Sequence, residues 1–270
     1  MQMILFVLLG LLSLWLEAKP NQDIPPIKKE VYTHFKLKNF TLSSAQGRKY
    51  KIFLAIPSTP PPKEGYSVLY MLDGNKQFPM LLNLYTPISS PPLIVAIGYL
   101  GHLGYDIPAR THDYTPKAKG KQYAQGGGAE EFYHFIENKL KPTITSHYPI
   151  NTNKQALFGH SFGGLFVLYT LFTHPKAFND YIAASPSLWW GDGVIIPTHK
   201  PFIKSLPHSL TITLGELENK PSKAPFNAYT LTQELRKQGV NAAFISFPHQ
   251  THGSSIAAAL KTALKVIASP

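Results

Sequence analysis

The residues most able to do chemistry form the pentapeptide Gly159-His160-Ser161-Phe162-Gly163, which fits the pattern Gly-X-Ser-X-Gly. An apolar, strand-like stretch at residues 155–158 runs directly into it, and an apolar, helix-like stretch at residues 165–172 follows. A sharp bend between strand and helix can expose a serine hydroxyl as a nucleophile, and flanking glycines keep that bend clear of side chains. The pattern predicts acyl transfer through Ser161. A glycine-rich helix start is the alternative interpretation.

A serine hydroxyl is a poor nucleophile near neutral pH and needs a base to accept its proton. His249 and His252 lie between a strand-like stretch at residues 242–247 and a helix that begins near Ser255. We favour His252, because His-Gly-Ser at the start of the helix places the ring at the carboxyl edge of a sheet. His249 remains the alternative. The sequence holds no His-Glu-X-X-His or comparable cluster, so we expect neither a metal site nor a cofactor.

A catalytic carboxylate is expected between Ser161 and His252 in the chain. The segment Gly215-Glu216-Leu217-Glu218 follows a strand-like stretch at residues 210–214, which places two glutamates at the same edge. We assign the role to Glu218, with Glu216 as the other candidate. The alternative is a Ser–His dyad in which both glutamates form exposed ion pairs.

Acyl transfer also needs donors for the oxyanion that develops on the carbonyl. The backbone N–H of Phe162 would supply one. The second is expected in the loop Leu72-Asp73-Gly74-Asn75, where Gly74 or Asn75 would present an amide. Asp73 would then serve either this site or the following helix as a cap.

The elements that must position these residues indicate an α/β fold. Two longer segments, residues 31–42 and 50–57, alternate in polarity and predict an antiparallel pair. After them, short apolar strands alternate with amphipathic helices, which predicts a mostly parallel sheet with helices on both faces. The expected strands are residues 67–72, 93–98, 155–158, 181–184, 210–214 and 242–247.

The N-terminus begins with an apolar run from Ile4 to Leu16, which has the length of a signal-peptide core and is too short to cross a bilayer. We expect residues 1–18 to be a signal peptide that directs the chain to the periplasm, although no Lys or Arg precedes the run and an uncleaved anchor is the alternative. Residues 19–30 are expected to be a linker. Residues 31–270 form a single domain with an insertion at residues 99–128 and no membrane span.

The composition favours an anionic partner. The formal net charge is +11, and removal of residues 1–18 would delete one acidic residue, Glu17, and no basic one. The basic residues are scattered and form no basic helix, so we expect no nucleic acid.

Several blocks are more specific than the pentapeptide. They are residues 68–75, Asp113-Tyr114-Thr115-Pro116, residues 126–130, residues 157–165 and residues 183–190. Together they resemble an esterase family of the α/β-hydrolase superfamily, and within it the periplasmic esterases that open the trilactones enterobactin and salmochelin. The resemblance spans roughly residues 50–260.

The resemblance implies an α/β-hydrolase fold and hydrolysis of a catecholate siderophore trilactone, as its iron complex, through Ser161 and His252. Arg110 matches an arginine that the family carries ahead of its Asp-aromatic-Thr-Pro block, and it would reach substrate oxygens. Such a complex is a bulky anion, which suits Arg110 and the flat faces of Trp189 and Trp190; His160 is grouped with them as a substrate-contacting residue. Structural alternatives are an Arg110–Asp113 ion pair and tryptophans that pack in a loop. Functional alternatives are another ester substrate (an acylated sugar, thioester or xenobiotic ester) and a non-catalytic siderophore-binding module.

Overall fold

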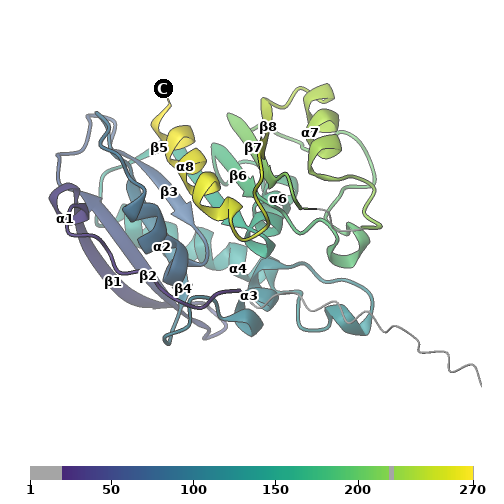
Figure 1. Cartoon of the computed structure of the whole chain (residues 1–270), viewed down its shortest axis with the longest axis horizontal. Helices are drawn as coiled ribbons and strands as arrows, with labels where there is room; N and C mark the ends of the chain where they lie inside the picture. Colours follow the sequence, from purple (N-terminus) through teal and green to yellow (C-terminus); the bar gives the residue numbers. More distant parts are fainter. Residues whose placement is uncertain (1–19, 219–221, 270) are drawn as a thin grey trace, which may run out of the picture.

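A twisted eight-stranded sheet runs through the molecule with helices on both faces (Figure 1). The computed structural model describes residues 20–218 and 222–269, so the predicted signal peptide lies outside the described residues. The strand order is β1-β2-β4-β3-β5-β6-β7-β8, in which β2 is antiparallel to β1 and β4 and all other neighbours are parallel. The strands are β1 (Phe35–Ser43), β2 (Lys49–Pro57), β3 (Tyr66–Met71), β4 (Leu93–Tyr99), β5 (Ile150–His160), β6 (Asp180–Ala184), β7 (Ser209–Gly215) and β8 (Ala242–Phe247).

The predicted fold class is confirmed, with two differences at strand ends. The segment 31–34 is a short helix, α1 (Val31–His34), because it forms a turn on residues 28–30 and buries Val31 before β1 begins. Strand β5 is longer than expected, since it pairs with β3 already at Ile150 and again from Gln155, with an irregularity in register between them. The alternation of apolar residues detects only the buried half of such a strand.

Two apolar clusters lie on opposite faces of the sheet. Alternate residues of β3 point into them, with Val68 and Tyr70 in one and Leu69 and Met71 in the other. The first cluster is covered by α4 (Ala129–Phe135), α6 (Phe162–Thr173) and α7 (Ala228–Lys237), and the second by α2 (Gly74–Asn83) and α8 (Ser255–Ala268). Helix α4 continues through a π-helical turn (Ile136–Leu140) into α5 (Lys141–Thr145). Burial of these faces supplies the main stabilisation of the fold.

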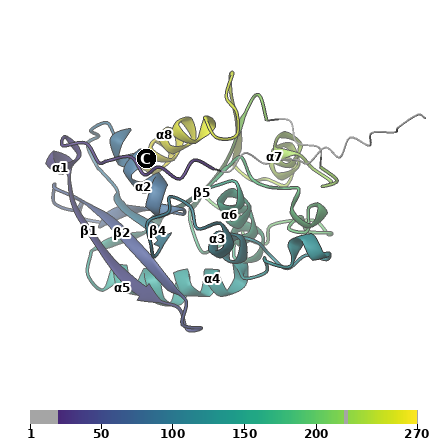
Figure 2. The ribbon, with the colours of Figure 1, turned by 60° about the horizontal axis from the view of Figure 1, so that its bottom comes forward.

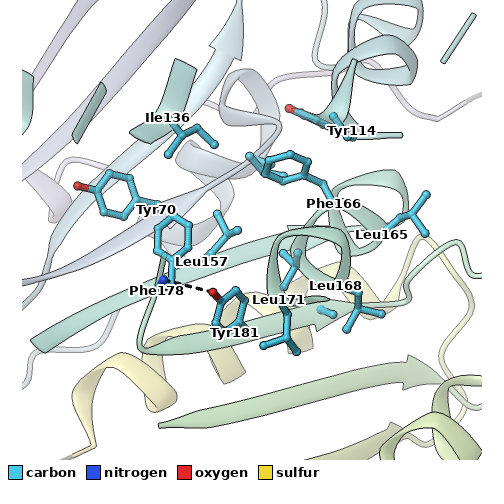
Figure 3. Packing of buried hydrophobic residues seen from close by; sticks show 14 of the residues in the cluster. Tyr70, Tyr114, Ile136, Leu157, Leu165, Phe166, Leu168, Leu171, Phe178 and Tyr181 are labelled. Atoms are coloured by element: carbon cyan, nitrogen blue, oxygen red, sulfur yellow. Dashed lines mark hydrogen bonds between the residues drawn. The ribbon is translucent and has the colours of Figure 1, made fainter. Parts of the chain in front are cut away.

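The insertion at residues 99–128 is folded and joins the first cluster. It contains α3 (Ile107–Tyr114) and a short 3-10 turn (Lys121–Tyr123). The Tyr114 ring lies 5.3 Å from that of Phe132 and 6.2 Å from that of Phe166 on α6, and Figure 3 shows Tyr114 facing Phe166 in the packed interior. This packing anchors the insertion against α6, the helix that follows Ser161.

Residues 20–30 have no regular structure over most of their length, yet they are docked on the domain. Asn83 on α2 accepts a hydrogen bond from Lys28 N (2.9 Å) and donates one to the carbonyl of Pro26 (2.8 Å). Gln22 Oε1 accepts from Tyr105 N in the insertion at 2.8 Å. The segment runs past α2 before it reaches α1 (Figure 2). None of the helices in the described ranges combines the length and apolar character needed to cross a bilayer.

Candidate active site

The pentapeptide forms a sharp bend between β5 and α6, as predicted. Ser161 adopts φ 61° and ψ −117°, an unusual conformation for a residue with a side chain. A Cβ at Gly159 would lie 2.3 Å from the carbonyl oxygen of Gly163, so only glycine fits there. A Cβ at Gly163 would make ordinary contacts, whereas one at Gly164 would lie 2.6 Å from the Ala184 carbonyl oxygen. The expectation that both glycines of the pentapeptide are sterically required is therefore right for Gly159 and wrong for Gly163.

Strained backbone gathers at this edge of the sheet. Four residues with side chains have positive φ just after a strand ends: Asp73 after β3, Ser161 after β5, Ser185 after β6 and His249 after β8. Such conformations persist only where the surrounding structure enforces them, and they cluster at functional sites. The carboxyl edge of the parallel strands is thus the place where this fold positions reactive groups.

His252 and Glu218 form a close pair at the same edge. His252 Nδ1 lies 2.6 Å from Glu218 Oε2, and the glutamate side chain is 9% exposed. A carboxylate only accepts, so Nδ1 carries the proton and Nε2 is left as the basic nitrogen. Burial alone would raise the pKa of the Glu218 carboxyl, but hydrogen bonds from His252 and Ser185 outweigh it and hold this pKa below its ordinary value. This arrangement can stabilise an imidazolium after proton transfer.

Ser161 follows the residue whose ring packs against His252, but within the described residues no hydrogen bond joins Ser161 to the Glu218–His252 pair. The His252 ring packs 4.6 Å from the ring of His160, the residue before Ser161. In the part of the chain that the structure describes, the side-chain hydrogen bond of Ser161 goes to Ser187 Oγ, at 3.3 Å. Catalytic hydrogen bonds often form fully only when substrate is bound.

His160 was expected to contact substrate, and the structure gives it an internal role instead. Its side chain is buried, and Nε2 donates to the carbonyl oxygen of His252 at 2.9 Å. Burial, with a smaller contribution from His252, lowers the pKa of His160 to about 3, so the ring is neutral near neutral pH. His160 therefore supports the loop that carries His252.

Three amides in the loop after β3 could complete an oxyanion hole; one is hydrogen-bonded elsewhere and one faces the backbone of β4. Asp73 N donates to the hydroxyl of Tyr114 at 3.2 Å. Asn75 N lies close to Gly98, since a Cβ added to that glycine would be 3.0 Å from this nitrogen. The Asn75 side chain donates to the Tyr99 carbonyl and accepts from the Tyr99 N–H. Gly74 N, like Phe162 N, is the first amide of a helix and has no carbonyl partner within that helix. The two expected donors are thus Phe162 and Gly74, and Asn75 acts as a clamp on β4.

Arg110 pairs with Asp73, so both sequence-based interpretations of this arginine need correction. Its Nε and Nη2 each lie 2.9 Å from an Asp73 carboxylate oxygen, and Nη2 also reaches the carbonyl of His160 at 3.3 Å. The guanidinium is buried, and the Asp73 carboxylate raises its pKa although burial alone would lower it. Asp113, the expected partner, pairs with Arg48 at 3.1 Å. Asp73 also makes no side-chain cap, because its carboxylate is occupied by Arg110. The buried guanidinium thus braces the site from inside, between Asp73 and the His160 carbonyl.

The two tryptophans differ in exposure. Trp190 is buried, donates its Nε1–H to the Pro116 carbonyl at 2.9 Å and packs against Tyr123. It holds the insertion to the loop after β6, so the packing interpretation is right for Trp190. Trp189 is half-buried and lies 5.7 Å from the Phe162 ring, next to the nucleophile. Only Trp189 can offer part of its surface to a ligand.

The sequence reasoning assigned no role to several residues that the fold brings to the site. Ser187 contacts the nucleophile, and Ser185 donates to Glu218 Oε1 at 2.7 Å. Both belong to the 183–190 block, which was the available signal. Lys117, Lys119 and Lys121 are exposed on the insertion that Trp190 ties to this edge. No group of three His, Cys, Asp or Glu side chains within residues 20–218 and 222–269 could hold a metal ion.

Comparison with known proteins identifies an esterase family. Residues 43–222 match the family described as "Putative esterase". The chain is 35% identical over 253 residues to the ferri-bacillibactin esterase BesA of Bacillus subtilis, covering 84% of this chain and 88% of that protein. It is 33% identical to an apo-salmochelin esterase of Escherichia coli, covering 92% and 84%.

Solved structures show the same fold. The BES protein of Bacillus cereus superposes with a TM-score of 0.80 at 28% identity, over 93% of this chain and all of that one. The enterobactin hydrolase IroE in complex with DFP superposes with a TM-score of 0.73 at 32% identity, over 87% and 96%. The Gly-X-Ser-X-Gly bend, the Glu218–His252 pair and these matches lead to one conclusion: the chain belongs to this esterase family and is a carboxylic ester hydrolase.

Proposed function

We propose that this protein is a serine esterase that hydrolyses the trilactone backbone of a catecholate siderophore, with the iron-loaded form as its substrate. The observation that carries the proposal is the Glu218–His252 pair, 2.6 Å apart, whose imidazole packs against His160, the residue before the strained Ser161. The similarity to esterases named for ferri-bacillibactin and apo-salmochelin supports the substrate class. Those two names differ in the iron state, so both forms of the substrate must be compared.

The chemistry follows from the positions of the groups. Ser161 Oγ attacks an ester carbonyl as His252 Nε2 takes its proton, and the oxyanion is held by the amides of Phe162 and Gly74. The imidazolium then protonates the departing alkoxide, which leaves an acyl-enzyme on Ser161. Water, deprotonated by His252, releases the acid and restores the serine. Glu218 keeps the imidazole oriented and compensates its charge in both steps.

Charge on the insertion supports an anionic substrate. Arg110 is neutralised by Asp73, so it contributes little attraction, and the exposed Lys117, Lys119 and Lys121 take its place in the proposal. They lie on the segment that packs on Trp190, and the half-buried Trp189 next to it offers an aromatic surface. A net charge of +11 favours encounter with a trianionic ferric catecholate.

The test compares ferric and apo trilactones with a simple aryl ester, using one preparation and chromatography of the products. We expect both trilactones to be opened, the ferric form faster, and Ser161→Ala to abolish turnover and labelling by a fluorophosphonate probe. Ser146→Ala, at an exposed serine directly after α5, serves as the matched control. Cleavage of the aryl ester with intact trilactones would contradict the substrate, and absence of labelling would leave only a binding module.

We propose in addition that residues 1–18 export the chain to the periplasm. The support is the apolar run from Ile4 to Leu16 in the sequence. Fractionation of cells by osmotic shock and N-terminal sequencing of the recovered protein test it: a chain that starts at Met1 and stays in the cytoplasmic fraction would contradict export.

A further inference from the structure

Two buried serine hydroxyls connect the acid to the loop of the base. Ser185 and Ser255 are 2% and 1% exposed, and their Oγ atoms lie 3.4 Å apart. Ser185 Oγ is 2.7 Å from Glu218 Oε1, and Ser255 Oγ is 3.1 Å from the carbonyl oxygen of His252. The four groups lie one after another between the carboxylate and the backbone of the histidine.

The direction of the hydrogen bonds in this chain follows from the chemistry of its ends. A carboxylate and a carbonyl oxygen only accept, and each serine has a single proton to donate. The Ser185 proton therefore goes to Glu218, and the Ser255 proton goes to the His252 carbonyl. The two hydroxyls thus donate away from each other, Ser185 to the Glu218 carboxylate and Ser255 to the His252 backbone.

Glu218 Oε1 is saturated by this arrangement. It accepts from Ser185 Oγ and from Gly215 N, each at 2.7 Å, while Oε2 is left for His252 Nδ1. Two donors on one oxygen fix the plane of the carboxylate, so its other oxygen points at the imidazole.

The backbone of Ser185 is held in an unfavourable conformation to reach this position. Its φ is 44°, in the left-handed region that favours glycine, and its N–H donates to the Thr213 carbonyl at 2.8 Å. A serine in a glycine-like conformation, buried and pointing at a catalytic carboxylate, is the kind of strain that marks a functional position.

We infer that Ser185 is a positioning residue, whose hydroxyl holds Glu218 in the orientation that His252 needs, with Ser255 bracing the histidine loop from the other side. The inference rests on the proposed use of Ser161, His252 and Glu218 in catalysis. Ser185 does not touch the substrate, so its effect passes through Glu218 and falls on turnover.

The experiment removes the hydroxyl in two ways and measures the pH profile of aryl ester hydrolysis. Ser185→Ala keeps the Cβ, whereas Ser185→Gly also relieves the backbone, which guards against a variant that merely fails to fold. We expect kcat to fall about tenfold with KM unchanged, as for loss of one charge-assisted hydrogen bond. The midpoint of the acid limb should move to lower pH, in the direction of Glu218→Gln but by less, because the carboxylate is then less well held beside the imidazole.

A double-mutant cycle with Glu218→Gln separates positioning from general damage. If Ser185 acts through Glu218, its removal costs little more once the carboxylate is gone. Ser67→Ala, a buried serine on β3, is the matched control and should keep the wild-type profile. A profile that coincides with the wild type, a midpoint that moves to higher pH, or full additivity with Glu218→Gln overturns the inference. The aryl ester makes the result independent of the siderophore: intact trilactones would sink the proposed substrate and leave this test standing.

Discussion

Two glutamate–histidine pairs lie at the carboxyl edge of the sheet, on the same two loops, and they differ in distance and burial. Glu218 and His252 are 2.6 Å apart, with side chains 9% and 35% exposed. Glu216 and His249 are 3.8 Å apart, with side chains 52% and 91% exposed. Residue type and order along the chain are the same for both pairs. The difference teaches that burial and added contacts, a hydrogen bond from Ser185 to Glu218 and one from His160 to the His252 carbonyl, distinguish the pair that we propose as catalytic.

The largest contrast is expected from removal of the two histidines. His252→Ala should lower kcat for an aryl ester by about 10⁴-fold, because Ser161 then lacks its base. His249→Ala should stay within about twofold, since an exposed pair contributes little. Steady-state kinetics on both variants measures the ratio. Comparable losses in the two variants would mean that the exposed pair also serves the reaction.

A smaller contrast is expected between the two glutamates. Glu218→Gln should lower kcat by about 10²- to 10⁴-fold, because the imidazole loses both its orientation and the charge that stabilises its protonated form. Glu216→Gln should leave kcat nearly unchanged. If Glu218→Gln retained more than a third of wild-type activity, the enzyme would work as a Ser–His dyad.

The smallest effect concerns His160, which packs under His252 and has no counterpart in the exposed pair. Its folded-state pKa is about 3, against about 6.5 for an unperturbed histidine. Below pH 6.5 the His160 ring therefore binds a proton in the unfolded chain but not in the folded protein. The free energy of unfolding falls for this reason as the pH drops toward 3. Between pH 7 and pH 5, the titration of His160 should lower the free energy of unfolding by about 2 kcal/mol.

Urea unfolding of wild type and His160→Gln at pH 7 and pH 5 checks this value. The glutamine can still donate to the His252 carbonyl but does not titrate, so its stability should fall less on acidification. Equal losses in the two proteins would show that His160 is already accessible to protons in the folded state.

Much of the fold could be predicted because its signals are local. Buried parallel strands such as β3 and β4 are continuous apolar runs, and the helix after Ser161 is apolar throughout. The polar first half of β5 and the helical turn at Val31–His34 carry no such signal, since tertiary contacts decide them. The residues Ser161, His252 and Glu218 followed from their places after strands.

The partners of the charged and aromatic residues could not be predicted in the same way. Arg110 is close in sequence to Asp113, but α3 turns it toward Asp73, which lies 37 positions away. Trp189 and Trp190 are neighbours, yet the insertion buries one of them and leaves the other half-buried. Spacing along the sequence does not predict such pairs, because they depend on how separate elements pack.

The amino-acid sequence by itself determined the class of fold, the strained serine between strand and helix, and the types of acid and base available to it. Those features depend on periodicity and on residues near one another in the chain. Only the tertiary structure decided which histidine and which glutamate are buried together, which amide is free for an oxyanion, and where Ser185 donates its proton. These choices depend on distances between loops that meet only when the sheet is assembled.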